Sequence, residues 1–208
     1  RSPGPDYSEP FYIEVTEGNV PLEATSGLQM STDKTNWSDT TQTTLSTGKT
    51  YFRVASDQQS PLKPAWGSNP GSGSGSGSDD DPDYEYNVGG NINSLVKVNF
   101  ANDTTCYAFF DNVNNNGFFE NKTKLKSAGN LILPATTLAQ GCYGSMFSGC
   151  TSLTTAPVLP ATTLADRCYS NMFDECISLT TAPELTATTL TDRCYYYMFS
   201  TTKSKTNC

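Results

Sequence analysis

The C-terminal part of the chain repeats one motif every 26 residues, and this repeat constrains the fold more than any other feature. Three successive units begin near residues 133, 159 and 185, on the pattern L-P-A-T-T-L-x-x-x-C-Y-x-x-M-F-x-x-C-x-S-L-T-T-A-P. The recurring side chains are Cys142, Cys168 and Cys194, Met146, Met172 and Met198, and Phe147, Phe173 and Phe199. A period of this length is typical of arrays in which each unit contacts only its neighbours, so that stacking builds the core.

Within one unit the apolar residues follow a helical spacing. Leu164, Cys168 and Met172 stand at i, i+4 and i+8, with Phe173 beside them, which predicts a short helix with one apolar face. The following "SLTTAP" segment is rich in threonine and ends at a proline, so it predicts a brief strand. We therefore predict an α/β fold for this part: a solenoid of 26-residue coils, each with a short helix and a short parallel strand.

The array loses its pattern at both ends. Residues 118–133 match the second half of a unit, and Lys122 stands there at the second cysteine place. After the last unit, Thr202 and Lys205 fall where a cysteine and a leucine stand in the other units. Polar residues in a terminal unit fit a solvent-facing cap. A truncated array would look the same.

The first third of the chain has a different pattern. Residues 1–10 contain three prolines and predict a flexible N-terminal segment. Residues 11–66 alternate apolar and polar side chains in short runs, as in "FYIEVTE", and predict a small antiparallel β-sandwich with Trp37 and Phe52 in its core. Residues 67–83 hold Gly-Ser pairs and four aspartates, which predicts a linker, natural or engineered, before the repeat domain at 84–208.

Composition excludes several classes of function. A formal charge of −8 with 13 Lys and Arg leaves no basic stripe for nucleic acid, and no apolar run is long enough for a membrane span. Histidine is absent, so the commonest general base and metal ligand are missing. We expect no enzymatic activity, no cofactor and no metal site.

The seven cysteines raise the question of disulfides. Cys142, Cys168 and Cys194 would lie on the helical side of successive coils, about 10 Å apart, which is too far for a bridge. Cys150 and Cys176 should lie closer together. We expect buried thiols that pack as small apolar groups, with disulfides as the alternative.

The repeats resemble the leucine-rich repeats of BspA-like surface proteins of Bacteroides-type bacteria. The resemblance rests on "MFSGCTSLTTAPVLPATTLA" (146–165) and on the lead-in "NVGGNINSLV" (87–96), and it covers about residues 84–208. It implies a leucine-rich-repeat solenoid in an exported, extracellular, non-catalytic protein of the bacterial cell surface. Such a protein would adhere to a host or matrix protein or to a glycan. The chain begins at Arg1 and shows no export signal, so we expect a mature or trimmed product.

The variable places of the repeat are where a partner would bind. They include the candidate partner-binding residues Arg167, Asn171, Arg193, Tyr196 and Tyr197. The alternative function is structural: a subunit of a surface fibre, a pilus or a phage particle, in which the repeats pack against copies of themselves. The unpatterned C-terminal end of the array favours that alternative.

Overall fold

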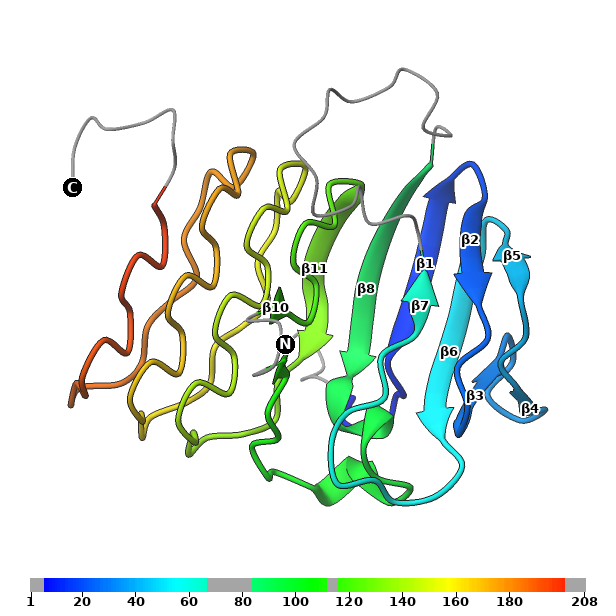
Figure 1. Ribbon diagram of the computed structural model, residues 1–208, viewed down its shortest axis with the longest axis horizontal. Coiled ribbons are helices and arrows are strands. Elements are labelled where there is room, and N and C mark those ends of the chain that lie inside the picture. The colour runs from blue at the N-terminus through cyan, green and yellow to red at the C-terminus, as the bar shows by residue number, and fades with distance from the viewer. Residues whose placement is uncertain (1–5, 67–83, 112–115, 201–208) are drawn as a thin grey trace.

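The computed structural model describes residues 6–66, 84–111 and 116–200, and a six-stranded sheet is its largest element (Figure 1). The strand order is β11-β8-β1-β6-β3-β4. The strands are β1 (Tyr12–Glu17), β3 (Leu28–Ser31), β4 (Ser38–Asp39), β6 (Gly48–Val54), β8 (Glu85–Asn91) and β11 (Leu125–Ile132). All neighbours are antiparallel except β8 and β11, which run parallel, so the sheet is mixed.

Smaller elements complete the strand-rich part. A three-stranded sheet has the order β5-β2-β7, and β9 pairs with β10 in a two-stranded one. Their bounds are β2 (Val20–Glu23), β5 (Thr43–Leu45), β7 (Ala65–Trp66), β9 (Phe110–Asp111) and β10 (Asn116–Gly117). The helices of the described residues are two short 3₁₀ turns, η1 (Ile92–Leu95) and η2 (Phe100–Asn102).

The alternation in the "FYIEVTE" segment correctly predicts the residues that face the core. Phe11, Ile13 and Val15 are all buried in the core. Phe52 is buried as predicted, but Trp37 is only half-buried, with its indole N–H donated to the carbonyl of Lys34. The tryptophan of the core is Trp66.

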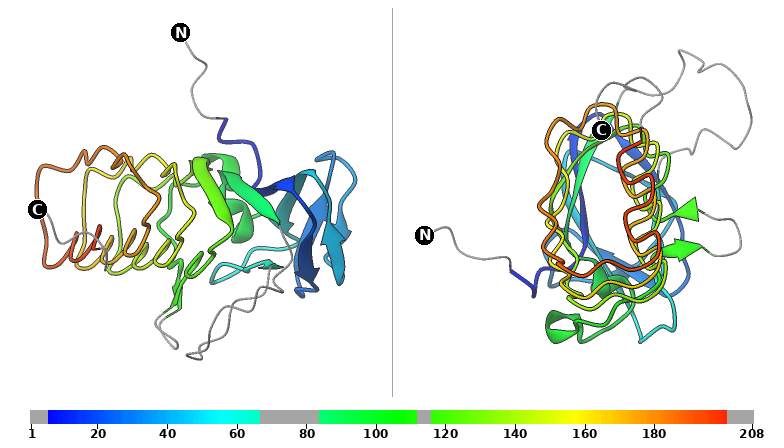
Figure 2. Two further views of the ribbon diagram at one scale, coloured as in Figure 1. Left: turned by 90° about the horizontal axis from the view of Figure 1, so that it is seen from above. Right: turned by 90° about the vertical axis from the view of Figure 1, so that its left-hand side faces the viewer.

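The sheet continues from the N-terminal strands into the repeat region. β8 lies between β1 and β11, so a strand that follows residues 67–83 in sequence pairs with the first strand of the chain. Gly90, at φ +74°, lets this happen, because a Cβ there would overlap the carbonyl of Pro10. The strand-rich part and the repeats therefore form one continuous structure (Figures 1 and 2).

The α/β prediction is wrong: residues 133–200 contain no helix and no extended strand, and the described chain is almost entirely β-strands and turns. The segment predicted as a helix is a series of tight turns. Within it the backbone takes a left-handed φ at every fourth residue, as at Arg167, Asn171 and Glu175. The same geometry recurs in the units before and after, at Gly141, Ser145, Gly149, Arg193 and Tyr197. We predicted a leucine-rich-repeat solenoid with helices, preceded by a separate antiparallel sandwich. The structure instead shows a mixed sheet that passes into stacked coils of turns.

Hydrogen bonds between coils explain why turns replace the helix. Along the turns, every second N–H bonds three residues back, as from Met146 to Tyr143. The intervening N–H groups bond to the next coil, as from Phe147 to the Met172 carbonyl at 2.9 Å. An α-helix would use every N–H within its own segment and leave none for the neighbouring coil. Because the backbones bond directly, successive coils stand at about the 4.8 Å spacing of paired strands, not the ~10 Å expected for packed helices.

The apolar repeat residues form rows that run along the stack. Phe119, Phe147, Phe173 and Phe199 stack with ring centres 5.1, 5.5 and 5.7 Å apart. The row meets the strand-rich part at Trp66, whose ring lies 6.0 Å from that of Phe119. A second row contains Phe109, Tyr143, Tyr169 and Tyr195. One apolar core therefore extends from the three-stranded sheet to the last described coil.

Candidate functional site

The turn segments of the three coils form a wall in which pairs of side chains point alternately inward, to the core, and outward, to the surface. We call residues 139–150, 165–176 and 191–200 the turn wall. In the middle coil, Cys168-Tyr169 and Met172-Phe173 point inward and are buried, while Asp166-Arg167 and Ser170-Asn171 lie at the surface. We call the outer surface of this wall the corner face. Its side chains come from the places that the sequence identifies as variable.

All five predicted partner-binding residues lie on the corner face. Arg167 and Arg193 stand 26 residues apart in one row, and Asn171 and Tyr197 do so in the next, with Tyr196 beside them. Backbone bonds hold the rows together: the N–H of Arg167 donates to the Asp192 carbonyl at 3.0 Å, and that of Asn171 donates to the Tyr196 carbonyl at 2.8 Å. The structure therefore brings the five residues to one surface.

The last coil carries the aromatic part of this surface. Tyr196 and Tyr197 are both exposed, and their ring centres lie 4.2 Å apart at an angle of 73°. The guanidinium of Arg193 lies 5.9 Å from the centre of the Tyr196 ring. A hydrogen bond with Tyr197 raises the pKa of Tyr196, so the Tyr196 hydroxyl stays neutral and can donate or accept at neutral pH.

Charges of both signs alternate on the corner face. Arg193 pairs with Asp192 at 3.8 Å, an exposed contact that stabilises the fold little. The carboxylate of Asp166 accepts the Asp192 N–H at 3.1 Å and so links two coils. Burial, and then the neighbouring Glu175 charge, raises the pKa of Asp174. The face has no single-sign field, and it suits a partner recognised by hydrogen bonds and aromatic contact.

The described cysteines of the repeats are packing groups of the turn wall, as predicted. Cys142, Cys168 and Cys194 are buried, and the thiols of Cys150 and Cys176 each donate to a carbonyl of the preceding coil at 3.1 Å. Burial raises the pKa of Cys168 to about 11 and that of Cys176 to about 12. These thiols are therefore protonated and unreactive at neutral pH. The six cysteines of the described residues are free, and Cys208 lies outside those residues.

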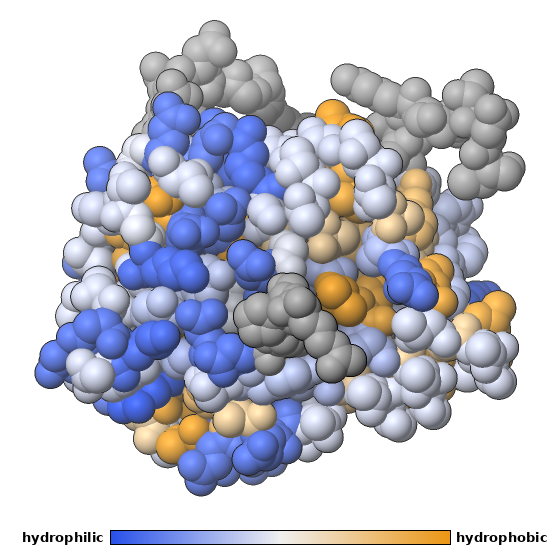
Figure 3. All heavy atoms as spheres, turned by 180° about the vertical axis from the view of Figure 1, so that it is seen from behind, coloured by the Kyte–Doolittle hydropathy of each residue, from blue (hydrophilic) through white to orange (hydrophobic). Residues whose placement is uncertain are grey.

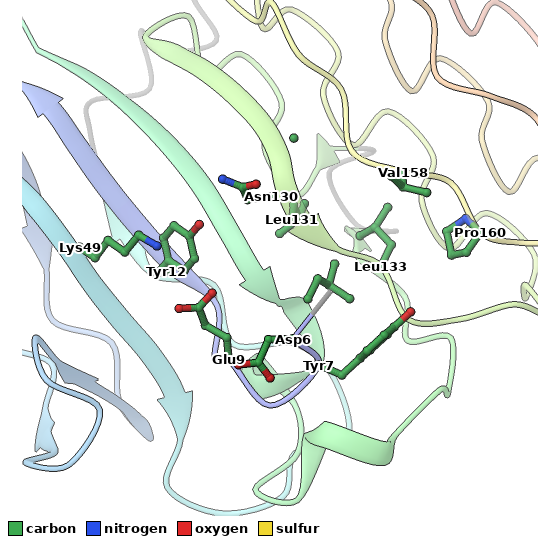
Figure 4. A pocket seen from close by; sticks show the side chains of 12 residues that line it. Asp6, Tyr7, Glu9, Tyr12, Lys49, Asn130, Leu131, Leu133, Val158 and Pro160 are labelled. Atoms are coloured by element: carbon green, nitrogen blue, oxygen red, sulfur yellow. The ribbon is translucent and has the colours of Figure 1, made fainter. Parts of the chain in front are cut away.

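A cleft that the sequence does not predict lies where β11 passes into the coils. It has a volume of about 390 Å³ and is lined by Tyr7, Tyr12, Lys49, Leu133 and Val158, among others (Figure 4). The Lys49 ammonium sits 4.1 Å from the centre of the Tyr12 ring, and Tyr7 and Val158 are exposed. No local signal could have shown it, because Tyr7 belongs to the segment predicted as flexible and comes to line the same cleft as Val158 only through the fold.

The exposed apolar residues gather on the coils. In the view from behind, hydrophilic side chains cover much of the strand end, while apolar patches lie toward the coils (Figure 3). Most large apolar side chains that the described residues expose belong to the units: Val158, Ile177, Leu185, Leu190, Tyr196, Tyr197 and Phe199. The coil end of the molecule therefore carries most of the exposed apolar side chains of the described residues.

The described residues contain neither a metal-ligand cluster nor a membrane-spanning helix. Across 6–66, 84–111 and 116–200, no three His, Cys, Asp or Glu side chains come together as metal ligands. In that same part of the chain no helix has the length and apolarity to cross a bilayer. Comparison with protein families, curated proteins and solved structures finds no match to this chain.

Proposed function

We propose that this chain is a non-catalytic binding protein of the bacterial cell surface whose corner face holds a host or matrix protein or a glycan. One observation carries the proposal: Arg167, Asn171, Arg193, Tyr196 and Tyr197 stand together on one wall whose backbone is bonded from coil to coil. Paired exposed tyrosines beside an arginine are typical of interface hot spots and of surfaces that stack on sugars.

The wall supports binding by presenting these side chains in a fixed arrangement. Each coil adds one arginine or glycine to the first row and one serine, asparagine or tyrosine to the second, at the spacing of paired strands. Hydrogen bonds between the coils already order the backbone. The entropy cost of binding a partner therefore comes mainly from ordering side chains. A flat surface of regular rows fits an extended partner better than a small compact ligand.

The sequence resemblance supports the same function. The 146–165 segment resembles repeats of BspA-like surface proteins, which implies an extracellular, adhesive role. The absence of histidine and the mixed charges of the corner face also suit binding by contact.

The test is a binding screen of the whole 208-residue chain against arrays of glycans and of extracellular-matrix proteins. For a partner found this way, we expect the double change Tyr196→Ala and Tyr197→Ala to weaken binding by about tenfold or more, as loss of a hot spot does. Arg193→Ala should weaken it as well. Glu184→Gln, an exposed change outside the turn wall, is the matched control and should bind normally.

Two results would count against the corner face. One is unchanged affinity in the tyrosine double variant and in Arg193→Ala. The other is loss of binding in Tyr7→Ala with normal binding in the tyrosine variant, which would move the site to the cleft of Figure 4.

A further inference from the structure

Two cysteines from different parts of the chain meet at the start of the turn wall. Cys142 belongs to the first segment of the wall, and Cys106 lies in residues 103–109, which lead from η2 to β9 and which we call the strap. The Cys142 thiol donates a hydrogen bond to the sulfur of Cys106, so the two side chains are in direct contact. Both cysteines are free in the structure.

Hydrogen bonds at both ends hold the strap against the wall. At one end the buried side-chain amide of Asn93 donates to the carbonyls of Asp103 at 2.9 Å and Thr105 at 3.2 Å. At the other end the N–H of Phe109 donates to the Cys142 carbonyl at 3.0 Å, in the same way that successive coils are bonded. The strap therefore cannot carry its cysteine away from the wall without breaking these bonds.

The two thiols differ in their access to solvent. Cys142 is 1% exposed, whereas Cys106 is half-buried between the exposed residues Thr105 and Ala108. The hydrogen bond from Cys142, with a further one from the Ala139 amide, lowers the pKa of Cys106 despite its burial. The same bond, and then burial, raises the pKa of Cys142. A partly exposed thiol of lowered pKa beside a second thiol is the arrangement of an attacking and a resolving cysteine.

We propose that Cys106 and Cys142 are joined in a disulfide when the chain meets a small-molecule disulfide, such as oxidised glutathione. The contact between the two side chains, held in place by the strap, carries the proposal. Bond formation brings the sulfur atoms from hydrogen-bond contact to about 2.05 Å. An extracellular location would supply the oxidising conditions that preserve such a bond. The inference does not depend on what the corner face binds.

The exchange takes two steps. The Cys106 thiolate attacks one sulfur of oxidised glutathione, and the first glutathione leaves as a thiolate that takes up the proton Cys106 has lost. Cys106 is then no longer a thiolate that holds the Cys142 proton, so Cys142 ionises and attacks the Cys106 sulfur. The second glutathione leaves and takes up the Cys142 proton. Two protein thiols are thus oxidised to one disulfide, and one glutathione disulfide is reduced to two thiols.

The bond would fasten the junction between the sheet and the coils. It closes a loop from residue 106 to residue 142 that contains β9, β10 and β11. Closing a loop of this length restricts the unfolded chain and so stabilises the folded one. The contact that it fixes is the one between the strap and the first segment of the turn wall.

The test is peptide mapping of the intact 208-residue chain after treatment with oxidised glutathione. The protein is unfolded, its remaining thiols are alkylated, and the digest is analysed by mass spectrometry. We expect a peptide that links Cys106 to Cys142, with Cys150 and Cys176 alkylated because their buried thiols already donate to carbonyls. The melting temperature should rise by about 5 °C or more over that of the reduced chain, and a dithiol reductant should reverse the rise.

Matched variants assign the shift to this pair. Cys106→Ser changes a half-buried side chain and should fold, which circular dichroism checks. We expect it to give no linked peptide and the same melting temperature with and without oxidised glutathione. Thr105→Ser, at the exposed neighbouring position, keeps both thiols and should behave as the wild type.

Three outcomes would overturn the proposal. The first is a digest of the treated wild type without the peptide that links Cys106 to Cys142. The second is a peptide that links Cys142 to Cys168 in its place. The third is an equal rise in melting temperature for the wild type and Cys106→Ser, which would place the effect of the oxidant at other residues.

Discussion

Lys122 shows how one residue can adapt a repeat to its boundary. It stands at the place that Cys150 and Cys176 occupy in the following coils, and like them it is buried. Its ammonium donates to the Trp66 carbonyl at 2.6 Å and lies 5.1 Å from the centre of the indole ring. A thiol would be too short to reach β7, so the lysine ties the first coil to the three-stranded sheet. Burial, and then the charge of Lys63, lowers the pKa of Lys122 to about 8.

This lowered pKa predicts a pH-dependent stability. The unfolded lysine titrates near 10.5 and the folded one near 8, so between these values the unfolded chain binds more protons. The contribution of Lys122 to folding therefore improves as pH rises through this window, by on the order of 3 kcal/mol at most. We expect urea unfolding at pH 8 and pH 10 to show this gain in the wild type and not in Lys122→Met.

The comparison between variants isolates the effect, because the tyrosines, which titrate near pH 10 in the unfolded chain, are the same in both proteins. Lys124→Met, at a neighbouring half-buried lysine, should keep the wild-type dependence on pH. Parallel curves for wild type and Lys122→Met would show that Lys122 titrates normally in the folded chain.

At the scale of the element, the left-handed turn is the unit from which the wall is built. Only glycine adopts this backbone without cost, yet the second coil has Arg167, Asn171 and Glu175 at its left-handed positions, where the first has Gly141, Ser145 and Gly149. Each non-glycine residue there costs about 1–2 kcal/mol. The cost is offset by the inter-coil hydrogen bond that each position makes possible.

The adjacent residues Asp174 and Glu175 give a matched test of this argument. Glu175 has a φ of 59°, while Asp174 is not among the positive-φ residues. We expect Glu175→Gly to raise the free energy of unfolding by about 1 kcal/mol and Asp174→Gly to lower it by a similar amount. Both changes remove one carboxylate and keep the backbone bonds. Equal effects of the two changes in urea unfolding would contradict a left-handed backbone at Glu175.

The sequence predicts the period, the inward rows and the outward places of this element, but not its conformation. Leu164, Cys168 and Met172 at i, i+4 and i+8 fit a helix of 3.6 residues per turn as well as a turn of four. The paired inward residues, such as Tyr169 beside Cys168 and Phe173 beside Met172, fit the four-residue period better. Glycine at 141 and 149 was the local signal for left-handed backbone. Bonds to the neighbouring coil, which decide the conformation, come from residues 26 positions away.

At the scale of the whole molecule, the six-stranded sheet and the apolar core both contain residues from before and after the segment 67–83. The shared sheet could not be predicted, because it depends on β8 pairing with a strand about 70 residues earlier, and the cleft could not be predicted, because Tyr7 and Val158 line it together only in the folded chain. β1 covers one edge of β8, and Phe11 and Trp66 each lie near Phe119, at ring distances of 6.0 Å. Residues 84–208 alone would expose that edge and this aromatic cluster.

We therefore expect the strand-rich part and the repeats to fold as one cooperative unit. A protease site inserted between residues 67 and 83 allows the chain to be cut after folding. The two pieces should then stay together in size-exclusion chromatography and unfold in a single thermal transition, because the paired strands and the shared core hold them without the covalent connection. The isolated 84–208 piece should lack this transition, since an unpaired β8 and an uncovered Phe119 remove a large part of its buried surface. Separation of the pieces, with the 84–208 piece keeping the melting temperature of the intact chain, would instead show two independent domains.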